Sequence, residues 1–461
     1  MSETAPTIFI IFGITGDLAG RKLLPALLAL YSKQLLPQQF SIIGVARRPF
    51  NREEFRQFIR EHINVRTGQY REEDVKHFID HIEYEQGVFD NQDLYTRLAQ
   101  RMENIQTRFK QCSNKLIHLS VPPNLCENIL NRLAIAKLHV PCADKFGWTR
   151  ILVEKPFGNN IDGAVKLEKL LGSLFVEDQI FRIDHYLAKE SLQNILTFRF
   201  VNSLFEPLWN QKFIDRIHIR LLEKEEVGIR APFYDQVGAL KDVGQNHVLQ
   251  MLALIAMEKP VGFTAETIRK ERAKVLKSLE IVSGKALKDH VCRAQYYGYE
   301  KEKGVIEGSP TETYFMIKCF VGNSRWRNVP FFLESGKALK ESKTEICVYF
   351  KSEDDPDREN VLIFRIQPDE GIKIRFWIKT PGFPMTVEPK TLSFKYSELT
   401  GHMVLPDAYE KLIYDAIAGD QTLFASTDEV MYAWKFITPI LQSWANIPLA
   451  HYKKGSMGPL E

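Results

Sequence analysis

The stretch TIFIIFGITGDLAG, residues 7–20, leads a short apolar run into a glycine-containing turn. The run TIFIIF has the length and composition of a buried strand, and the turn has the pattern G-x-x-G-x-x-A from Gly13 to Ala19. The apolar segment after the turn predicts a helix, which Pro25 either kinks or restarts. A strand, a glycine turn and a helix in this order are typical of the first βαβ unit of a dinucleotide-binding domain. An ordinary glycine turn is the alternative.

The first part of the chain continues this alternation of strands and helices. Apolar runs at residues 40–46, 115–121 and 150–156 are separated by helical stretches, among them a polar helical region between residues 51 and 111. Such alternation predicts a doubly wound parallel sheet of the Rossmann type.

The second part has a different pattern. From about residue 210, runs such as RIHIRLL (216–222) and VLIFRIQ (361–367) follow one another with short polar turns between them. They predict a mainly antiparallel sheet, which helices at residues 247–257 and 428–445 should cover. Because 461 residues exceed what one core usually organises, we expect two domains. The predicted fold class is α/β plus α+β, with domains at residues 1–180 and 181–461.

Composition excludes several classes of partner. The chain has 61 basic and 58 acidic residues, so bulk charge does not favour a nucleic-acid or membrane partner. No apolar run is long enough for a membrane helix, and the N-terminus lacks the features of a signal peptide, so we expect a cytoplasmic protein. The six cysteines form no CxxC pair and there is no HExxH motif. We therefore expect six free thiols and no metal site.

The glycine turn and the end of the second strand together indicate the nucleotide. Gly13 lets the backbone approach a pyrophosphate, and the following helix begins with unpaired N–H groups. Arg47 and Arg48 end the apolar run 40–46, where an NAD-binding domain usually carries an acid for the ribose hydroxyl. Arginine there suits the 2′-phosphate of NADP. The alternative is a solvated arginine pair before a loop.

Lys155 follows the apolar run 150–153 in the stretch ILVEKPFG. Ligands of open parallel sheets bind beyond the carboxyl ends of the strands, so Lys155 is placed to contact both cofactor and substrate. The Lys155–Pro156 bond is a candidate for the cis form. An ordinary strand end is the alternative.

The stretch RIDHYLAKE, residues 182–190, gathers groups that bind anions. His185 and Lys189 are four residues apart and share a face if the segment is helical, and Tyr186 adds a further donor. These donors suit a phosphate monoester, which has three terminal oxygens. Asp184 either caps the following helix or orients a histidine elsewhere.

That histidine is His247, at the start of a strongly apolar helix. Asp242 lies five residues earlier, about 140° away on an α-helix, so it is poorly placed to hold the ring. Asp184 is our candidate partner, in a dyad whose carboxylate orients the imidazole while the imidazole takes a hydroxyl proton as hydride leaves carbon. A core histidine bonded to a backbone carbonyl is the alternative.

In combination, these stretches resemble the glucose-6-phosphate dehydrogenase family. The residues that carry the resemblance occur in the family's order and cover nearly the whole chain: GITGDLAGRKLLPAL, VEKPFG, RIDHYLAKE, DVGQNHVLQ, VPFFLESGKALKESKTEI, IQPDEGI and LPDAYEKLIYDAIAGD.

The resemblance implies a reaction and a set of roles. It implies that His247, polarised by Asp184, takes the C1 hydroxyl proton of glucose 6-phosphate while the C1 hydride passes to NADP. The product would be a phosphogluconolactone, in the first step of the oxidative pentose phosphate pathway. The implied substrate-binding residues are His185, Tyr186, Lys189 and Lys337 for the phosphate, Glu225 and Asp242 for sugar hydroxyls, Lys155 between sugar and coenzyme, and Gln367. The implied cofactor-binding residues are Gly13, Thr15, Gly16, Asp17, Leu18, Arg47, Arg48 and Lys155.

The resemblance also implies an assembly. The family dimerises through its second domain, so we expect residues 1–180 to bind NADP and residues 181–461 to bind substrate and form a homodimer or homotetramer.

The chain departs from the family pattern at several points. Ala188 stands where the motif usually has glycine, and the segment IRAPF after Gly228 looks shorter than the family's loop beside Glu225. The chain ends without a long C-terminal extension, so we expect one NADP per subunit. A dehydrogenase of another hexose phosphate or of a free sugar, and a non-catalytic NADP-binding regulator, are the alternatives.

Overall fold

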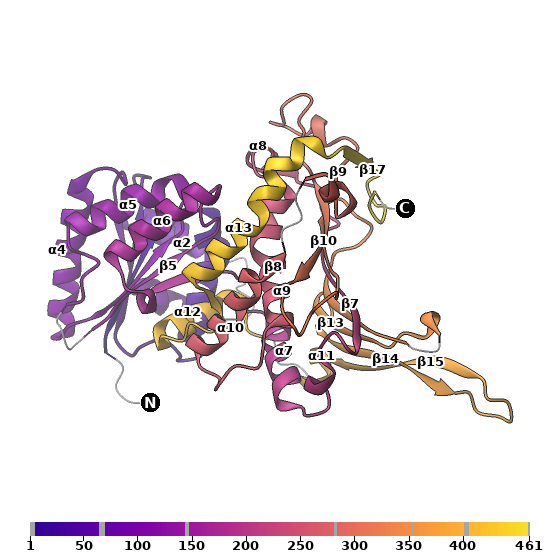
Figure 1. Ribbon diagram of the computed structural model, residues 1–461. Helices are drawn as coiled ribbons and strands as arrows, with labels where there is room; N and C mark the ends of the chain where they lie inside the picture. Colours follow the sequence, from indigo (N-terminus) through magenta and orange to yellow (C-terminus); the bar gives the residue numbers. More distant parts are fainter. Residues whose placement is uncertain are drawn as a thin grey trace. The chain divides into compact units, whose positions relative to one another are not determined.

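The computed structural model describes residues 5–63, 70–142, 147–280, 284–352, 355–400 and 405–459. The chain divides into two compact units (Figure 1). Unit 1 comprises Met1–Gly158, Asp162–Ala188 and Pro406–Thr427, and unit 2 comprises Asn159–Ile161, Lys189–Leu405 and Asp428–Glu461.

This division differs from the predicted boundary at residue 180. The strand at residues 180–183 and the turn up to Ala188 belong to unit 1, because that strand pairs with the parallel sheet. The segment Pro406–Thr427 also belongs to unit 1, although it comes late in the sequence. It contributes a helix and a short edge strand, and Arg150 Nη1 donates to the last carbonyls of that helix, those of Ala416 at 2.8 Å and Ile417 at 2.7 Å.

A seven-stranded sheet forms the centre of unit 1, in the order β16-β6-β5-β4-β1-β2-β3. The strands are β1 (Thr7–Phe12), β2 (Phe40–Ala46), β3 (Ile82–Gln86), β4 (Asn114–Leu119), β5 (Thr149–Val153), β6 (Ile180–Ile183) and β16 (Phe424–Ala425). All are parallel except β16, which runs antiparallel to β6. The chain moves from β1 to one side and then returns to β4 on the other, so the switch point lies between β1 and β4. This confirms the predicted Rossmann-type sheet.

Helices connect these strands, as the alternating pattern predicted (Figure 1). They are the π-helical segment η1 (Ala19–Leu23), which continues into α1 (Leu24–Ser32), and α2 (Arg52–Ile63), α3 (Glu72–Asp80), α4 (Gln92–Phe109), α5 (Pro123–Ile135), α6 (Ile161–Leu174) and α12 (Ala408–Ala418). Pro25 is the second residue of α1, where the π-helical segment η1 gives way to the α-helix.

Strand β3 lies inside the region for which the sequence predicted helices only, so that part of the prediction was wrong. The strand carries Glu83 and Glu85, and charged residues of this kind are uncommon in strands. Arginines of α4 neutralise them: Arg101 donates to Glu83 at 3.0 Å and to Glu85 at 2.8 Å, and Arg97 donates to Glu85 at 2.8 Å.

The prediction of six free thiols was also wrong. Cys112 and Cys142 form a disulfide, with their Cα atoms 5.8 Å apart. The two residues are 30 positions apart in the sequence, and only the fold brings their Cα atoms within disulfide distance. Cys126, Cys292, Cys319 and Cys347 are free thiols.

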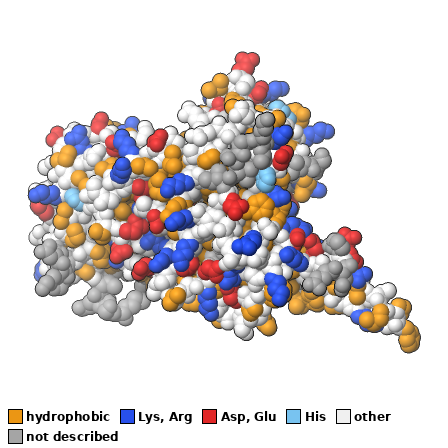
Figure 2. All heavy atoms as spheres, in the orientation of Figure 1, with side chains coloured by type: hydrophobic (Ala, Val, Ile, Leu, Met, Phe, Trp, Pro, Cys, Tyr) orange, Lys and Arg blue, Asp and Glu red, His pale blue; other side chains and the backbone are white. Residues whose placement is uncertain are grey.

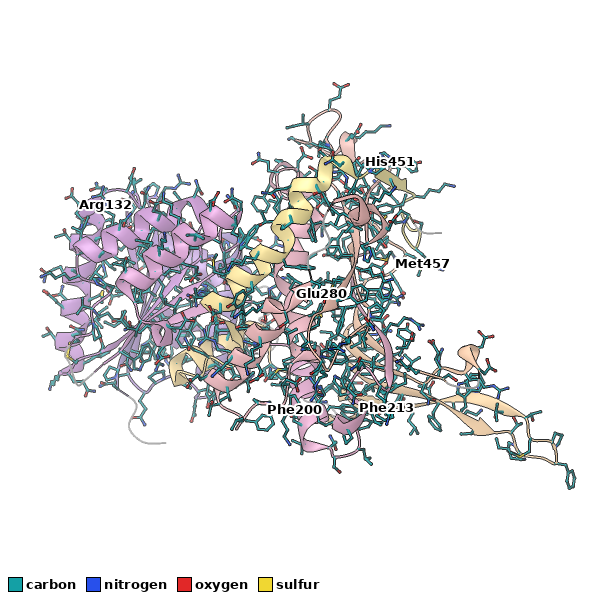
Figure 3. All side chains as sticks on the ribbon, in the orientation of Figure 1. Arg132, Phe200, Phe213, Glu280, His451 and Met457 are labelled. Atoms are coloured by element: carbon teal, nitrogen blue, oxygen red, sulfur yellow. A yellow bond between two sulfur atoms is a disulfide. The ribbon has the colours of Figure 1, made fainter. Side chains whose placement is uncertain are left out.

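Unit 2 is built on a ten-stranded sheet that is mainly antiparallel. Its order is β15-β14-β13-β12-β7-β11-β10-β9-β17, and β8 pairs with β10. The strands are β7 (Ile214–Leu222), β8 (Leu279–Glu280), β9 (Val291–Tyr296), β10 (Tyr314–Val321), β11 (Phe331–Gly336), β12 (Lys343–Phe350), β13 (Val361–Gln367), β14 (Gly371–Lys379), β15 (Val387–Lys395) and β17 (Leu449–Tyr452). Two pairs are parallel: β7 with β11, and β9 with β17, on which Figure 3 labels His451.

Helices of unit 2 cover one face of this sheet, as predicted (Figure 1): α7 (Glu190–Val201) packs on β13, and the π-helical segment η6 (Leu240–Val248) packs on β7 and β11. The segment η6 continues into α9 (Leu249–Ala256), on which α10 (Ala265–Lys277) packs, and the unit further contains α8 (Ala231–Tyr234), α11 (Tyr396–Thr400) and α13 (Thr427–Ser443). The hairpin β14–β15 extends from the rest of the unit, and Phe383 and Met385 are fully or largely exposed at its tip.

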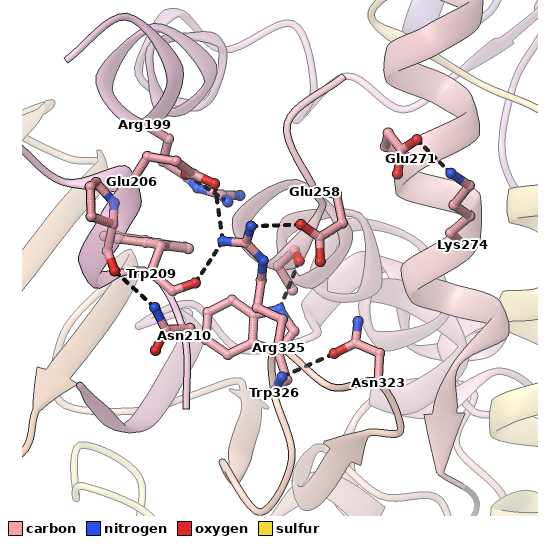
Figure 4. A network of polar contacts seen from close by, with 12 residues as sticks. Arg199, Glu206, Trp209, Asn210, Glu258, Glu271, Lys274, Asn323, Arg325 and Trp326 are labelled. Atoms are coloured by element: carbon pink, nitrogen blue, oxygen red, sulfur yellow. Dashed lines mark hydrogen bonds and ion pairs between the residues drawn. The ribbon is translucent and has the colours of Figure 1, made fainter. Parts of the chain in front are cut away.

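Three buried side chains close the carboxyl end of α9 (Figure 4). Arg199 Nη1 and Trp209 Nε1 each donate to the Ile255 carbonyl at 2.9 Å, and Trp326 Nε1 donates to the Ala256 carbonyl at 2.8 Å. These donors satisfy carbonyls that the helix itself leaves without partners. Glu206 pairs with Arg199 at 3.2 Å, which compensates part of the cost of burying the guanidinium.

The surface mixes both signs of charge. Figure 2 shows basic and acidic side chains interspersed on the visible face, in keeping with the nearly balanced composition. Among the described residues, no helix is long and apolar enough to cross a membrane.

The buried Asp415 of α12 predicts a pH dependence of stability. Burial raises its pKa from 3.8 to about 6, although Lys411 pairs with it. Between these values the native state binds more protons than the unfolded state, so the contribution of Asp415 to stability is present at low pH and is lost as the pH rises through about 6. The loss amounts to at most about 3 kcal/mol.

Asp415→Asn should therefore gain stability relative to the wild type between pH 4 and pH 7. Calorimetric midpoints of thermal unfolding measure this difference. Asp178→Asn, at an exposed carboxylate, is the control and should track the wild type. A constant difference between Asp415→Asn and the wild type across this pH range would contradict the assignment.

Candidate active site

The turn after β1 packs directly against the segment after β4. Gly13 has a φ of +82°, and a Cβ atom placed on it would lie 2.1 Å from the carbonyl oxygen of Ser120. The Gly13 N–H donates to the Val45 carbonyl at 2.8 Å, and the Gly16 N–H donates to the Gly13 carbonyl at 2.8 Å. Only glycine fits at residue 13, at the switch point where a Rossmann-type sheet holds a pyrophosphate.

The helix that follows begins at Asp17 and presents the N–H groups of its first turn beyond β1. The Asp17 carboxylate is exposed and pairs with Arg21 at 2.7 Å. A contact of Asp17 or Leu18 with a phosphate would therefore come from their backbone N–H groups, because the acidic side chain repels the anion and leucine has no donor, whereas Thr15 can also donate through its hydroxyl.

Arg47 and Arg48 directly follow β2, and both side chains are exposed. Side chains of β3 hold their backbone: Tyr84 Oη donates to the Arg48 carbonyl at 2.6 Å, and Gln86 Nε2 donates to the Arg47 carbonyl at 3.3 Å. The Arg48 guanidinium lies 5.9 Å from the centre of the Phe58 ring. The backbone of the pair is thus fixed, and the Arg47 side chain extends into solvent at the carboxyl end of β2.

The segment after β5 contains a buried polar cluster that the sequence did not reveal. Glu154 Oε1 lies 3.0 Å from His118 Nε2, and Tyr409 Oη donates to both Glu154 oxygens at 3.2 Å. Burial, with Glu154 nearby, raises the pKa of Tyr409. The Tyr409 ring stacks on His185, with ring centres 6.4 Å apart. Lys155 directly follows Glu154, which His118 and Tyr409 hold. The Lys155–Pro156 bond is cis, as the sequence suggested.

Residues 184–188 form a turn and not a helix, so the condition under which His185 and Lys189 would share a helical face is not met. Asp184 is 1% exposed, and its Oδ1 accepts the N–H of Tyr186 at 3.0 Å. It therefore caps this turn, whereas α7 begins only at Glu190. The Asp side chain competes for local backbone N–H groups, which favours a turn over a helix here.

In unit 2, His247 lies in the π-helical segment η6 and is 1% exposed. The backbone N–H of His247 donates to Asn246 Oδ1 at 2.7 Å, and Asn246 Nδ2 donates to the Asp242 backbone carbonyl at 3.0 Å. The angle estimated for Asp242 and His247 assumed an α-helix and does not hold, since a π-helix bonds residue i to i+5. Asp242 is buried, and Arg230 Nη2 donates to its carboxylate at 3.3 Å.

The parallel pairing of β7 with β11 brings several candidate residues to one edge of the unit 2 sheet. Leu222 and Gly336 are register partners at the ends of these strands, so Glu223 and Lys337 emerge side by side. Lys337 is buried and its Nζ lies 2.6 Å from a Glu223 oxygen.

Neighbouring residues complete this edge. The Ala338 N–H donates to the Glu225 carbonyl at 2.9 Å, and Ser342 Oγ donates to the Glu225 carboxylate at 2.9 Å. The pKa of Glu225 is lowered by a hydrogen bond from its own backbone N–H and by the one from Ser342. The Glu225 residue is exposed. Gln367 ends β13 opposite Thr344, two strands from β7 at the same edge.

The structure thus brings part of the predicted residues together within each unit. Lys189 belongs to unit 2, whereas His185 and Tyr186 belong to unit 1, so their common phosphate site stays a prediction. At the carboxyl edge of the unit 1 sheet lie Gly13, Thr15, Gly16, Arg47, Arg48, Lys155, Asp184, His185 and Tyr186, and at one sheet edge of unit 2 lie Glu225, Lys337 and Gln367. Asp184 belongs to unit 1 and His247 to unit 2, so their pairing stays a prediction. Sequence reasoning missed His118, Glu223, Arg230 and Tyr409, because nothing in their spacing distinguishes them from ordinary surface or core residues.

Unit 1 has a doubly wound nucleotide-binding sheet with a lysine after its fifth strand. Unit 2 has a buried histidine and, at one sheet edge, acidic and cationic groups. Together these features are typical of a pyridine-nucleotide-dependent dehydrogenase. Comparison with known proteins gives the family. Residues 10–194 match the model of the glucose-6-phosphate dehydrogenase NAD binding domain, and residues 196–461 match that of the C-terminal domain. The chain belongs to the glucose-6-phosphate dehydrogenase family.

Curated relatives and solved structures agree along the whole chain. A glucose-6-phosphate 1-dehydrogenase of Aggregatibacter actinomycetemcomitans is 41% identical, over 98% of this chain and 93% of the relative. One of Borreliella burgdorferi is 38% identical, over 98% and 95%. A structure of glucose-6-phosphate dehydrogenase in complex with its substrate glucose-6-phosphate is similar with a TM-score of 0.92 and 33% identity, covering 100% of this chain and 97% of that one. Levoglucosan dehydrogenase, at a TM-score of 0.52 and 11% identity, shares the fold alone.

Gly13→Ala tests the nucleotide end of the site. The added methyl group must displace the Ser120 carbonyl, and the alanine must keep a positive φ, at a cost of about 1–3 kcal/mol. We expect the dissociation constant for NADPH, measured by fluorescence titration, to rise at least about tenfold. Gly172→Ala is the matched control, because a Cβ atom there meets nothing within 4 Å. Equal affinity of Gly13→Ala and the control would contradict this account of the turn.

Proposed function

We propose that this chain is a glucose-6-phosphate 1-dehydrogenase that oxidises the C1 hydroxyl of glucose 6-phosphate to 6-phosphoglucono-1,5-lactone. The observation that carries the proposal is the match along nearly the full length to enzymes of that name, at 38% and 41% identity, together with a TM-score of 0.92 to a structure that holds this substrate. In the reaction the C1–H bond breaks and its electron pair leaves as hydride, while the hydroxyl loses its proton and C1 becomes a carbonyl carbon.

His247 is proposed as the general base and Asp184 as the carboxylate that orients it. A buried imidazole can take the hydroxyl proton if its other nitrogen is held by an acceptor, because that fixes the tautomer. Both side chains are 1% exposed, which limits competition from water.

Cationic and hydroxyl groups are proposed to hold the sugar phosphate. His185, Tyr186, Lys189 and Lys337 would bind the phosphate, Asp242 and Glu225 the sugar hydroxyls, and Lys155 both sugar and coenzyme, with Gln367 as a further contact. Support for the role of Lys337 comes from its position at the same sheet edge as Glu225 and Gln367. Glu223 pairs with its buried ammonium and would have to share it with the phosphate. The short stretch after Gly228 forms the 3-10 segment η5 (Gly228–Arg230) and α8.

NADP is the proposed coenzyme, and when bound it accepts the hydride. The residues present fit it: Gly13 lets the turns after β1 and β4 touch at the switch point of the sheet, and Arg47 directly follows β2 with an exposed side chain, where it can meet a 2′-phosphate. We further propose a cytoplasmic location and a homodimer or homotetramer assembled through unit 2.

Glucose and glucose 6-phosphate distinguish the enzyme from its alternatives. Formation of NADPH should depend on the 6-phosphate, since four of the proposed contacts serve that group. Equal turnover of free glucose would favour a dehydrogenase of unphosphorylated sugars. Absence of turnover with any sugar, together with tight NADP binding, would favour a regulator.

His247→Asn should lower kcat at least about a hundredfold with a modest change in the KM for glucose 6-phosphate, because an amide cannot accept the proton. Steady-state kinetics measure this effect. The control is His290→Asn, at a half-buried histidine whose Nδ1 lies 3.3 Å from the Lys318 carbonyl. Unchanged turnover in His247→Asn would remove the proposed base.

Arg47→Ala should raise the KM for NADP far more than the KM for NAD, because only NADP carries the 2′-phosphate. The ratio of the two KM values is the readout. Arg52→Ala, an exposed arginine at the start of α2, should leave the ratio unchanged. An equal effect of Arg47→Ala on both coenzymes would refute this role.

A further inference from the structure

The start of the helical segment that carries His247 rests on a buried carboxylate that none of the proposed roles uses. Glu312 is 4% exposed and comes just before β10. Its Oε1 accepts the N–H of Leu240, the first residue of η6, at 3.0 Å, and its carbonyl accepts the Ala239 N–H at 3.1 Å. A carboxylate at this end of a helical segment satisfies an otherwise unpaired N–H and interacts favourably with the helix dipole.

The carboxylate fits closely into its surroundings. Its Oε2 accepts the indole N–H of Trp444 at 2.9 Å. Gly238, which has a φ of +74°, lies against the same group, and a Cβ atom there would be 2.4 Å from Oε1. Both oxygens therefore meet N–H donors, and the backbone just before η6 is pressed onto the carboxylate.

The segment that presents Glu312 is itself anchored. Gln295 Nε2 donates to the Ser309 carbonyl at 3.0 Å and to the Thr311 carbonyl at 2.9 Å. Thr311 Oγ1 donates to the Asp235 carbonyl at 2.6 Å. Strand β9 thus holds the segment that carries Glu312, through Gln295, and the hydrogen bonds of Glu312 in turn fix the first turn of η6.

The other end of the same helix is closed by Arg199, Trp209 and Trp326, which donate to its last carbonyls. With both ends bonded, the rotation of the helix about its axis is fixed, and so are the directions of Asp242 and His247. Burial raises the pKa of Glu312, which shows that the carboxylate is costly to keep at this place. An apolar side chain would fill the space without that cost but could not accept the two N–H groups.

We propose that Glu312 is a positioning residue, which fixes the π-helical segment Leu240–Val248 and through it the placement of His247 and Asp242. The catalytic consequence rests on the proposed function, in which His247 is the base. The consequence for the helix does not.

Glu312→Gln tests both parts. The amide keeps the size of the side chain but turns an NH₂ group toward one of the two N–H donors, so one hydrogen bond is lost and two donors face each other. Glu429→Gln is the matched control: Glu429 is fully buried in unit 2 and its Oε1 lies 2.8 Å from Nε of Arg272, a residue of α10 and not of η6.

Amide hydrogen exchange, followed by mass spectrometry on the full chain, reads the helix without depending on activity. In Glu312→Gln, peptides covering residues 238–250 should exchange at least about tenfold faster, whereas the rest of unit 2 should match the wild type. In Glu429→Gln these peptides should be unchanged. Unchanged exchange at residues 238–250, or equally faster exchange throughout unit 2, would overturn the positioning role.

Steady-state kinetics with glucose 6-phosphate read the catalytic consequence. Well below the unfolding temperature, Glu312→Gln should lower kcat at least about tenfold and change the KM by less than about threefold, while Glu429→Gln keeps kcat within about twofold of the wild type. A loss of exchange protection without any loss of kcat would overturn the link to His247. Wild-type protein without activity would refute the proposed function, and the exchange result would still decide the structural role of Glu312.

Discussion

The close approach of two backbone segments at the switch point of the parallel sheet is the constraint on which the nucleotide-binding unit depends. No Cβ atom fits between Gly13 and the Ser120 carbonyl, so the turns after β1 and β4 touch. This contact sets the floor of the crevice in which a Rossmann-type sheet receives a pyrophosphate. Arg47, Lys155 and Asp184 each follow another strand of the same sheet, and its parallel order therefore carries the proposed coenzyme and substrate groups to one edge.

In unit 2, one parallel pair of strands in a mainly antiparallel sheet brings candidate residues to one edge. Most neighbours in its sheet are antiparallel, and antiparallel strands end at opposite edges. The parallel pairing of β7 with β11 makes both strands end at one edge, where Glu225 and Lys337 emerge together. The helix of His247 crosses behind these strands and is bonded at both ends, by Glu312 at its start and by Arg199 among others at its carboxyl end. Buried polar groups that are costly to desolvate thus hold the directions of the candidate active-site side chains.

The sequence predicted the features that local physics decides and failed where distant contacts decide. The apolar runs, the glycine turn at Gly13 and a change in the helix near Pro25 follow from composition and spacing, and the two kinds of sheet follow from the order of the runs. Strand β3 was missed because its glutamates look unfavourable until the arginines of α4 are placed beside them. The Cys112–Cys142 disulfide depends on proximity that spacing does not encode. The turn at Asp184 and the π-helical form around His247 were missed for a further reason: apolar periodicity does not distinguish an α-helix from a turn or a π-helix over so few residues.

In the proposed reaction a hydride passes from C1 of glucose 6-phosphate to the nicotinamide while a protein base takes the hydroxyl proton. Glucose 6-phosphate deuterated at C1 tests this transfer. The wild-type enzyme should transfer the label without dilution to C4 of the nicotinamide in reduced NADP, with a primary isotope effect on chemistry in single-turnover kinetics. Label found in the solvent instead of the coenzyme, or a reduced coenzyme that carries hydrogen from water, would contradict it.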